Sequence, residues 1–535
     1  MQSGYRAART PLFRSVVRAL RIASHSVATG RPPAEIVGEA LSRRTMLKGA
    51  GAGAFMLAGS PLLAACAQVA KGSGAPRIAI VGAGVAGLNA AYTLQKAGLQ
   101  AELFDANRRS GGRMFTGRDV LGPGLTVELG GEFIDTTHLD ILALAKEFNL
   151  ELIDTRTPAE SHLIGEAYFF EGRHYSPDEV IAAFLPLVPR LKADADSIGD
   201  VVNFQNDGGA KALDNMTMAQ YFDRIGASGW FRKLLEVAYV TEFGLDASEQ
   251  SALNFLDMIP TEAPDDGPLE LLGDSDERYK ILGGNQKIVD ELARRLDGQI
   301  RLEHRLTRIA GGNAGYDLSF DVAGGKPLQV RADIVIIAIP FTLLREVDIQ
   351  VALPGVKTKA IRELGYGMCA KVMAGFTARP WREQGFAGNI FSDEPFQLAW
   401  ENSRLQPAAG PQAGVTFYSG GAATMRAISG TPEEQAQRFM AAFEKAYPGS
   451  WKQFNGKTAR MDWPNYAWTR AAYACYRPGQ WTTISGAEFM PVGNLHFAGE
   501  HTSPDFLGFM NGGAETGRRA AEAILAGVGA FRKVA

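Results

Sequence analysis

The stretch IAIVGAGVAG, residues 78–87, decides the fold of this chain. Its first four residues form a short apolar run of the kind found in buried parallel strands. Three glycines follow in the spacing G-x-G-x-x-G, and residues 88–98 then carry apolar side chains at helical spacing as far as Gly98. A second apolar run, residues 100–104, leads directly to Asp105. This order of strand, glycine turn, helix, strand and acid predicts a Rossmann-type α/β unit that binds a dinucleotide.

Each glycine of the motif has a physical reason. Gly82 permits the tight turn, Gly84 lets the backbone approach a pyrophosphate, and Gly87 lets the helix lie against the strand. The first turn of the helix offers N–H groups and the positive end of its dipole to the phosphates. Asp105 is placed to accept hydrogen bonds from the adenosine ribose. The alternative is a tight glycine turn in an α/β protein that binds no nucleotide.

Further sequence blocks follow this motif in a fixed order. They are RRSGGR (108–113), ELGGEFID (128–135), LGGN (282–285), RLTRI (305–309), ADIVIIAIP (332–340), FAGEHT (497–502) and GFMNGGA (508–514). Together with the glycine motif they resemble the flavin-containing amine oxidase family, which includes monoamine oxidases, polyamine oxidases, L-amino-acid oxidases and related desaturases. The resemblance covers residues 76–528. It implies an α/β fold in which a Rossmann-type FAD-binding domain is interleaved with a mixed α+β substrate-binding domain.

The resemblance also implies which residues bind FAD. A Gly-Gly-Arg run after the ribose acid presents bare backbone and a guanidinium to the long dinucleotide, and the glutamate of FAGE contacts its ribityl or ribose side. The expected cofactor-binding residues are Gly82, Gly84, Gly87, Asp105, Arg109, Gly112, Arg113, Gly131, Glu132, Gly499, Glu500 and Met510. Some relatives attach FAD through a cysteine just before an active-site tyrosine. This chain has Ala472 there, so FAD is expected to be noncovalent.

Four residues are expected to serve catalysis, again by resemblance. Lys371 matches the family lysine that holds a water near flavin N5, and Trp463 matches the tryptophan beside the flavin. Tyr473 and Phe509 fall where the family places two facing aromatic rings that guide an amine nitrogen. The alternatives are a surface lysine and ordinary core aromatics. An apolar pocket lowers the pKa of a substrate amine, and a neutral amine needs no catalytic base to give up a hydride to the flavin.

The substrate is left open between a primary amine and an L-amino acid. Residues 132–138 lack the arginine with which some L-amino-acid oxidases hold a carboxylate, whereas residues 476–480, YRPGQ, resemble a stretch of those enzymes. Glu132 and Asp135 are candidates either to attract a cationic diamine or to serve as turn residues. Oxygen or a membrane acceptor is expected to reoxidise the flavin. The rival functions are a carotenoid-desaturase-like flavoenzyme and a non-catalytic FAD-binding protein.

The front of the chain differs chemically from the rest. Residues 1–66 carry nine Lys or Arg and two Glu, and residues 42–48, SRRTMLK, contain twin arginines followed by a small-residue and apolar stretch. This pattern resembles a Tat export signal, and the stretch is too short for a comfortable transmembrane helix. LAAC (63–66) resembles a lipobox, so the exported protein is expected either as a soluble periplasmic form or as a lipoprotein anchored at Cys66. The alternatives are a disordered basic tail and an organelle presequence with an amphipathic helix over residues 5–22.

Composition bounds the remaining possibilities. The chain has 535 residues and a net charge of -3, so no overall basic field favours a nucleic-acid partner. No His, Cys and carboxylate residues cluster at metal-ligand spacing, and Cys369 and Cys475 are able to form at most one disulfide. The expected segments are a signal region and linker (1–75), three FAD-binding parts (76–150, 276–345, 476–528), a mainly helical substrate part (151–275) and a second substrate part (346–475). The fold prediction therefore starts at residue 76.

Overall fold

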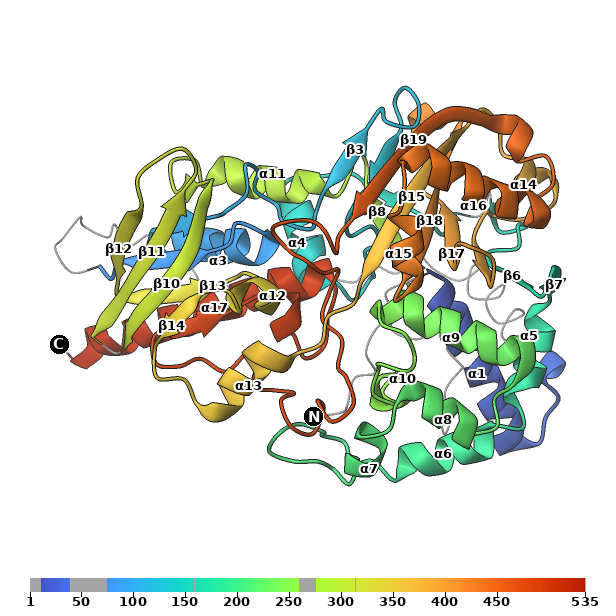
Figure 1. Ribbon diagram of the computed structural model, residues 1–535, viewed down its shortest axis with the longest axis horizontal. Helices are drawn as coiled ribbons and strands as arrows, with labels where there is room; N and C mark the ends of the chain where they lie inside the picture. Colours follow the sequence, from blue (N-terminus) through green and yellow to red (C-terminus); the bar gives the residue numbers. More distant parts are fainter. Residues whose placement is uncertain (1–10, 39–74, 158–159, 259–275, 313, 535) are drawn as a thin grey trace, which may run out of the picture.

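The chain forms two lobes that lie side by side (Figure 1). One lobe contains the glycine motif and the long C-terminal helix, and the other contains a large sheet and a group of helices. The computed structural model describes residues 11–38, 75–157, 160–258, 276–312 and 314–534.

A parallel sheet forms the centre of the first lobe, with the strand order β20-β13-β1-β2-β9. The glycine motif supplies β1 (Ile78–Val81) and helix α3 (Val85–Lys96). The other strands are β20 (Leu495–Phe497), β13 (Ile334–Ile337), β2 (Ala101–Phe104) and β9 (Ile300–Arg301). Asp105 follows β2 directly. The Rossmann-type α/β fold predicted from residues 78–105 is confirmed.

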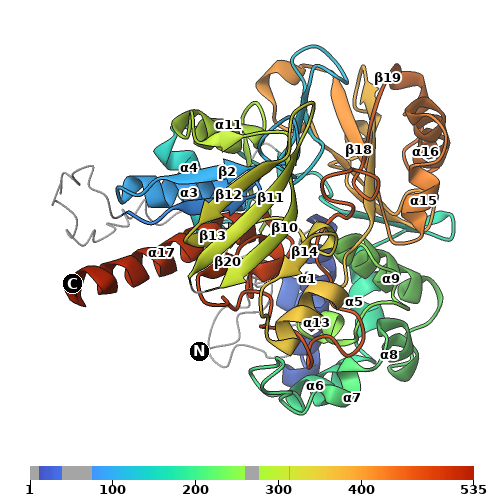
Figure 2. The same cartoon turned by 60° about the vertical axis from the view of Figure 1, so that its left-hand side comes forward.

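The two faces of this sheet are covered differently because side chains alternate along each strand. Ile78, Ile80 and Leu103 belong to a core shared with the helices. Ala79, Val81 and Phe104 belong to a core shared with a four-stranded sheet, and Figure 2 shows that sheet beside β13 and β20. The helices are α3, α4 (Leu139–Glu147), α11 (Gln286–Arg295) and α17 (Met510–Val534); the four strands are β12 (Leu328–Ala332), β11 (Gly315–Val322), β10 (His304–Gly312) and β14 (Asp348–Gln350).

The second lobe is built on a seven-stranded sheet of order β19-β15-β18-β17-β16-β6-β7. Ala370, Val372 and Ala374 pack toward helix α16 (Pro432–Ala446), so the alternate residues of β15, including Lys371, face the other side. The strands are β19 (Phe454–Asp462), β15 (Cys369–Phe376), β18 (Ala413–Gly420), β17 (Leu398–Glu401), β16 (Ile390–Ser392), β6 (Ala167–Phe170) and β7 (Arg173–Tyr175).

A helical layer covers part of this lobe, and its first helix comes from the front of the chain. Helix α1 (Pro11–Thr29) packs against α5, α6 and α9, and Val16, Leu20 and Ile22 on it are almost fully buried. Residues 11–38, which the sequence assigns to a signal region, thus pack against the second lobe. The other helices of the layer are α5 (Pro177–Phe184), α6 (Val188–Asp196), α7 (Lys211–Asp214), α8 (Met218–Arg224), α9 (Gly229–Phe243) and α10 (Leu253–Leu256).

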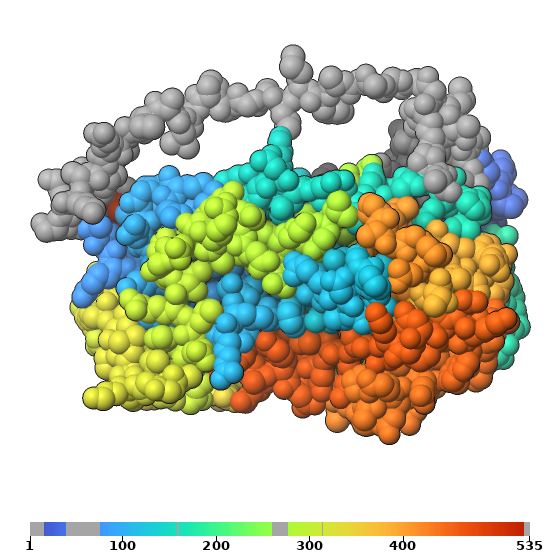
Figure 3. All heavy atoms as spheres, turned by 90° about the horizontal axis from the view of Figure 1, so that it is seen from above, coloured from blue at the N-terminus to red at the C-terminus, as the bar shows by residue number. Residues whose placement is uncertain are grey.

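Short elements complete the two lobes and the connections between them. They are the pairs β3 (Thr116–Arg118) with β4 (Thr126–Glu128) and β5 (Leu152–Asp154) with β8 (Tyr279–Ile281), the helices α12 (Phe341–Leu344), α13 (Gly355–Glu363), α14 (Pro380–Glu383) and α15 (Ala423–Ala427), and the single turns η2 (Pro407–Ala409), η3 (Trp451–Gln453) and η4 (Glu500–Thr502). Figure 3 shows blue, yellow-green and orange segments, far apart in the chain, side by side on one face. Within the described ranges, no helix has the length and apolarity needed to span a bilayer.

Candidate active site

A cavity of about 220 Å³ is lined by residues from both lobes. The first lobe contributes the glycine motif, Asp105 and the start of α17, and the second contributes Lys371 and aromatic side chains. Of the sequence-predicted residues, those that line the cavity are Gly82, Gly84, Asp105, Gly112, Arg113, Gly131, Glu132, Lys371, Trp463, Tyr473, Gly499, Glu500, Phe509 and Met510. Gly87 and Arg109 do not line it.

The glycine motif forms a cradle of bare backbone. A Cβ on Gly112 would lie 3.3 Å from the Cα of Gly84, so these two glycines approach closely at the cavity wall. Gly87 lies deeper, and a Cβ there would lie only 1.9 Å from the carbonyl oxygen of Gly82. The third glycine therefore permits helix–strand packing and does not need to face a ligand.

Asp105 is held by backbone and still has capacity to accept. Its Oδ2 accepts from the Ala83 N–H at 2.7 Å and its Oδ1 from the Asn107 N–H at 2.8 Å. Burial raises the pKa of this carboxyl group above its ordinary value, and the backbone donors oppose that rise. Each carboxylate oxygen has a second lone pair, so both are able to accept from the hydroxyls of a ribose.

Two helix N-termini open into the same cavity. Val85 and Ala86 of the first turn of α3 line it, and so do Met510 and Gly513 of the first turn of α17. The two helices touch through their backbones, since a Cβ on Gly517 would lie 2.1 Å from the carbonyl oxygen of Ala86. Two positive dipole ends suit a ligand with two negative regions, such as a pyrophosphate and a reduced flavin ring.

Arg113, which is partly buried, and Glu500, which is buried, form an ion pair between separate chain segments. Arg113 Nη1 donates to Glu500 Oε1 at 2.9 Å and to the carbonyl oxygen of Ala472. Glu500 Oε2 accepts from the Gly508 N–H at 2.8 Å. Arg109, by contrast, donates to the carbonyl oxygen of Gly112 at 2.7 Å. The guanidinium of Arg109 therefore braces the glycine turn and does not line the cavity, and its expected role in cofactor binding stays a prediction.

Lys371 lies on β15 with its ammonium group buried. Its Nζ donates to the carbonyl oxygens of Glu128 at 2.9 Å and Gly130 at 2.8 Å, and to Glu132 Oε2 at 3.2 Å. Burial lowers the pKa of Lys371, and the carboxylate of Glu132 opposes that effect. The surface-lysine alternative considered from sequence is therefore wrong.

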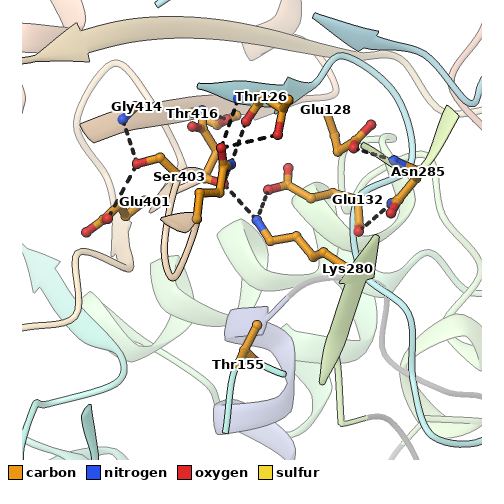
Figure 4. A network of polar contacts seen from close by, with 12 residues as sticks. Thr126, Glu128, Glu132, Thr155, Lys280, Asn285, Glu401, Ser403, Gly414 and Thr416 are labelled. Carbon is orange, nitrogen blue, oxygen red and sulfur yellow. Dashed lines mark hydrogen bonds and ion pairs between the residues drawn. The ribbon is translucent and has the colours of Figure 1, made fainter. Parts of the chain in front are cut away.

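Glu132 is shared between two lysines. Its Oε1 accepts from Lys280 Nζ at 2.8 Å while its Oε2 accepts from Lys371, an arrangement that Figure 4 shows for Lys280. Burial alone would raise the Glu132 pKa, but the two ammonium groups outweigh it and keep the pKa below its ordinary value. The carboxylate of Glu132 is thus neutralised from within the protein.

Aromatic side chains form much of the remaining wall. Trp463 Nε1 donates to the carbonyl oxygen of Leu129 at 3.0 Å. The Tyr473 hydroxyl donates to the carbonyl oxygen of Thr241 at 3.0 Å and lies 2.8 Å from the Tyr418 hydroxyl. The Phe509 ring packs edge-on against His138, with ring centroids 4.9 Å apart. Hydrogen bonds and ring contacts therefore fix the orientation of these rings.

The sequence analysis missed Trp400, Tyr418 and Lys280. Tyr418 reaches the cavity because β18 pairs with β15 and sets it opposite Lys371, and Trp400 lies on the next strand, β17. Both residues line the cavity. No signal close to either residue in the chain indicates this position, since it depends on strand pairing.

Two substrate hints from the sequence acquire structural roles. Asp135 is fully buried and accepts from the Glu277 N–H at 2.6 Å, and it does not line the cavity. The YRPGQ stretch ends in Gln480, whose Oε1 accepts from the Gly365 N–H at 3.0 Å. These hydrogen bonds connect separate loops. Asp135 and residues 476–480 therefore do not line the cavity, and neither supports the choice between a diamine and an L-amino acid as substrate.

The described residues contain no group of three or more His, Cys, Asp or Glu side chains with the geometry to hold a metal ion. Cys369 and Cys475 are both buried and are not joined by a disulfide.

The fold and site together define a dinucleotide-dependent oxidoreductase: a backbone cradle for phosphates, an acid for a ribose, and a second helix terminus for an anionic ring. A model of the family described as flavin containing amine oxidoreductase matches residues 85–525, and the chain belongs to this family. FAD is its cofactor, as the sequence predicted.

Known proteins of this family are similar to most of the chain. An L-amino acid dehydrogenase of Synechocystis sp. is 25% identical over 476 residues, which is 86% of this chain and 97% of that protein. A flavin-containing amine oxidase B of Canis lupus familiaris is 26% identical over 466 residues, 85% of this chain and 87% of that protein. The solved structure of a cyclohexylamine oxidase from Brevibacterium oxydans has a TM-score of 0.74 and 26% identity, covering 85% of this chain and 100% of its own.

Proposed function

We propose that the protein oxidises a primary amine that carries an apolar substituent. The FAD, when bound, accepts a hydride from the α-carbon of the amine. The resulting imine takes up water and gives an aldehyde and ammonia. The electrons pass on to oxygen, which becomes hydrogen peroxide, or to a membrane acceptor. The residues of this chain orient the amine and keep its surroundings apolar.

The observation that supports this substrate class is the charge pairing around the cavity. Every charged side chain that lines it already has partners within the protein: Asp105, Arg113, Glu132, Lys371 and Glu500. An L-amino acid would bring a carboxylate that requires an available cation, and a diamine would bring a second ammonium that requires an available carboxylate.

The rest of the wall favours a neutral amine. Phe133, Trp400, Tyr418, Tyr473 and Phe509 all line the cavity. An apolar surrounding disfavours the charged form of an amine and so lowers its pKa. An amine that sheds its proton here is ready to lose hydride without a catalytic base.

The known relatives support an amine and leave a second candidate. A cyclohexylamine oxidase and an amine oxidase B agree with the proposed class, whereas the relative named as an L-amino acid dehydrogenase favours an L-amino acid. A carotenoid-desaturase-like activity and a non-catalytic role have no comparable support among these relatives.

Anaerobic titration of the purified holoenzyme with matched compounds tests the substrate class. Phenethylamine and L-phenylalanine differ by one carboxylate, and hexylamine and hexamethylenediamine differ by one ammonium. We expect the monoamine of each pair to bleach the flavin absorbance at least about tenfold faster. Faster bleaching by L-phenylalanine would establish the amino-acid alternative. A flavin that stays oxidised with all four compounds would refute amine oxidation.

Export is a separate proposal that rests on sequence alone. The twin arginines, Arg43 and Arg44, and the lipobox cysteine, Cys66, lie outside the described residues. We propose that the Tat machinery exports the folded, FAD-loaded protein to the periplasm, where Cys66 decides between a soluble and a lipid-anchored form. Replacing both arginines by lysine tests this proposal, because the flavoprotein should then stay in the cytoplasm.

A further inference from the structure

Three buried side chains form a charged cluster beside the cavity. Lys280, Glu132 and Lys371 are each only 5–6% exposed, and the single carboxylate bonds to both ammonium groups. With these groups ionised, two positive charges share one negative charge. Lys280 comes from β8, outside the sequence blocks on which the family resemblance rests, and it does not itself line the cavity.

The distances show how the carboxylate is divided. Lys280 Nζ lies 2.8 Å from Glu132 Oε1 and is also held by the carbonyl oxygen of Asn402 at 2.8 Å. Figure 4 shows the ammonium group of Lys280 directed at the carboxylate of Glu132. Lys371 lies farther from the same carboxylate, at 3.2 Å. The carboxylate of Glu132 is therefore bound more closely to Lys280 than to Lys371.

The same distances show which donor of Lys371 is most easily released. An ammonium group has three N–H donors. Those to the carbonyl oxygens of Glu128 and Gly130 are short and fix the position of the group. The third donor, toward Glu132, makes the longest bond, and both Lys371 and Glu132 line the cavity.

We propose that Lys280 is a positioning residue for the flavin reaction and acts through Glu132. Lys280 draws the carboxylate away from Lys371, so the third N–H of Lys371 makes only a long bond of 3.2 Å and is the donor that a water or the cofactor most easily takes over. It also leaves the cluster with excess positive charge, which favours a ring that gains negative charge on reduction. Without Lys280, the buried carboxylate has one cationic partner left and moves onto Lys371.

The proposal predicts a loss that a second substitution reverses. In Lys280→Met, Glu132 should bind the third donor of Lys371 more closely, and the limiting rate of flavin bleaching by an amine should fall about tenfold. The apparent dissociation constant of the amine should change less than about twofold, since Lys280 does not touch the cavity. In the double variant Lys280→Met/Glu132→Gln, no carboxylate competes for Lys371, and the rate should return to within about threefold of the wild-type rate.

The midpoint potential of the bound flavin provides a readout that needs no substrate. Chemical reduction should give a lower midpoint potential for Lys280→Met, which removes a positive charge, and a higher one for Glu132→Gln, which removes a negative charge. The double variant removes one charge of each sign, so its potential should lie near that of the wild type. Lys287→Met is the matched control: this lysine lies in the same segment and, among the residues that the structure describes, donates only to the carbonyl oxygen of Leu282. It should leave the rate and the potential unchanged.

Several results would overturn the proposal. One is an unchanged potential in FAD-loaded Lys280→Met, and another is a double variant that loses more than the single variant, which would mark Lys280 as a packing residue. If Lys280→Met does not retain FAD, the test is the midpoint potential of the flavin in Glu132→Gln. A potential that is unchanged or lower than in the wild type would contradict the proposal. The rate test rests on the proposed amine oxidation. If no amine bleaches the flavin, the proposed amine oxidation is refuted. The midpoint potentials, which are measured without a substrate, still test the role of Lys280.

Discussion

At the scale of single residues, Glu128 carries a carboxyl group near the cavity whose pKa is strongly raised. Its Oε1 accepts from the Asn285 N–H at 2.8 Å and its Oε2 from the Thr116 hydroxyl at 2.9 Å, and Figure 4 shows the bond to Asn285. Burial raises the pKa of Glu128 to about 7, and the neighbouring carboxylate of Glu132 adds to the rise. The folded protein therefore holds a proton on Glu128 at pH values where the unfolded chain has lost it.

This shift predicts a pH dependence of stability. The folded pKa is raised, so the contribution of Glu128 is fully present below the ordinary value of 4.5 and is lost as pH rises toward 7. A shift of this size corresponds to about 3 kcal/mol. Residue 128 stays neutral in Glu128→Gln. The thermal unfolding midpoint of this variant should therefore rise relative to that of the wild type as pH increases from 4.5 toward 7. The control Glu383→Gln removes an exposed carboxylate and should run parallel to wild type.

Thermal unfolding of the holoenzymes in a series of buffers is the measurement. Burial also raises the pKa of Glu488 to about 7. Its contribution to the pH dependence of the unfolding midpoint is the same in wild type and in both variants. A Glu128→Gln curve parallel to wild type would show that Glu128 does not carry this proton.

At the scale of elements, helix α1 supports the second lobe and is connected to the active site. It packs against α9, and the Thr241 carbonyl of α9 accepts the hydroxyl of the cavity residue Tyr473. Tyr168 of β6 donates to Ser15 on α1 at 2.6 Å within the buried contact. A displaced α1 would therefore loosen the helix that positions an active-site ring.

Two substitutions on α1 should differ sharply. Leu20 is 1% exposed and Val27 is 45% exposed. Leu20→Asp places a carboxylate in the apolar contact with the second lobe and should cost about 3 kcal/mol or more. Val27→Asp keeps its carboxylate in water and should cost less than about 0.5 kcal/mol. Urea unfolding midpoints of the two holoenzymes measure the difference, and equal midpoints would mean that α1 does not pack on the lobe in solution.

At the scale of the whole molecule, the buried position of α1 bears on export. Cleavage near Cys66 would separate α1 from the rest of the chain, yet its apolar face is already part of the hydrophobic core. We predict that residues 11–38 stay with the mature enzyme, either in one chain or as a bound fragment. Mass spectrometry of the protein purified under native conditions and then denatured should detect them. An active enzyme that contains no residue before Cys66 would disprove the prediction.

The sequence alone determined the part of the fold that depends on contiguous residues. Residues 78–105 predict their strands, helix and acid because glycines at a fixed spacing serve one local backbone geometry. The ordered blocks predicted FAD and the α/β fold, since each block is short and carries its own backbone requirement. Gly87 also has its expected packing role.

Only the tertiary structure decided how charges and rings are paired. Lys280 meets Glu132 across 148 residues of chain, and Tyr418 reaches Lys371 through strand pairing. Helix α1 has the basic, apolar pattern of a leader, and its burial became visible only with α5, α6 and α9 in place. A backbone motif depends on neighbouring residues, so the sequence shows it directly. The partner of a buried charge or of an apolar face depends on which distant segment packs against it in the folded protein.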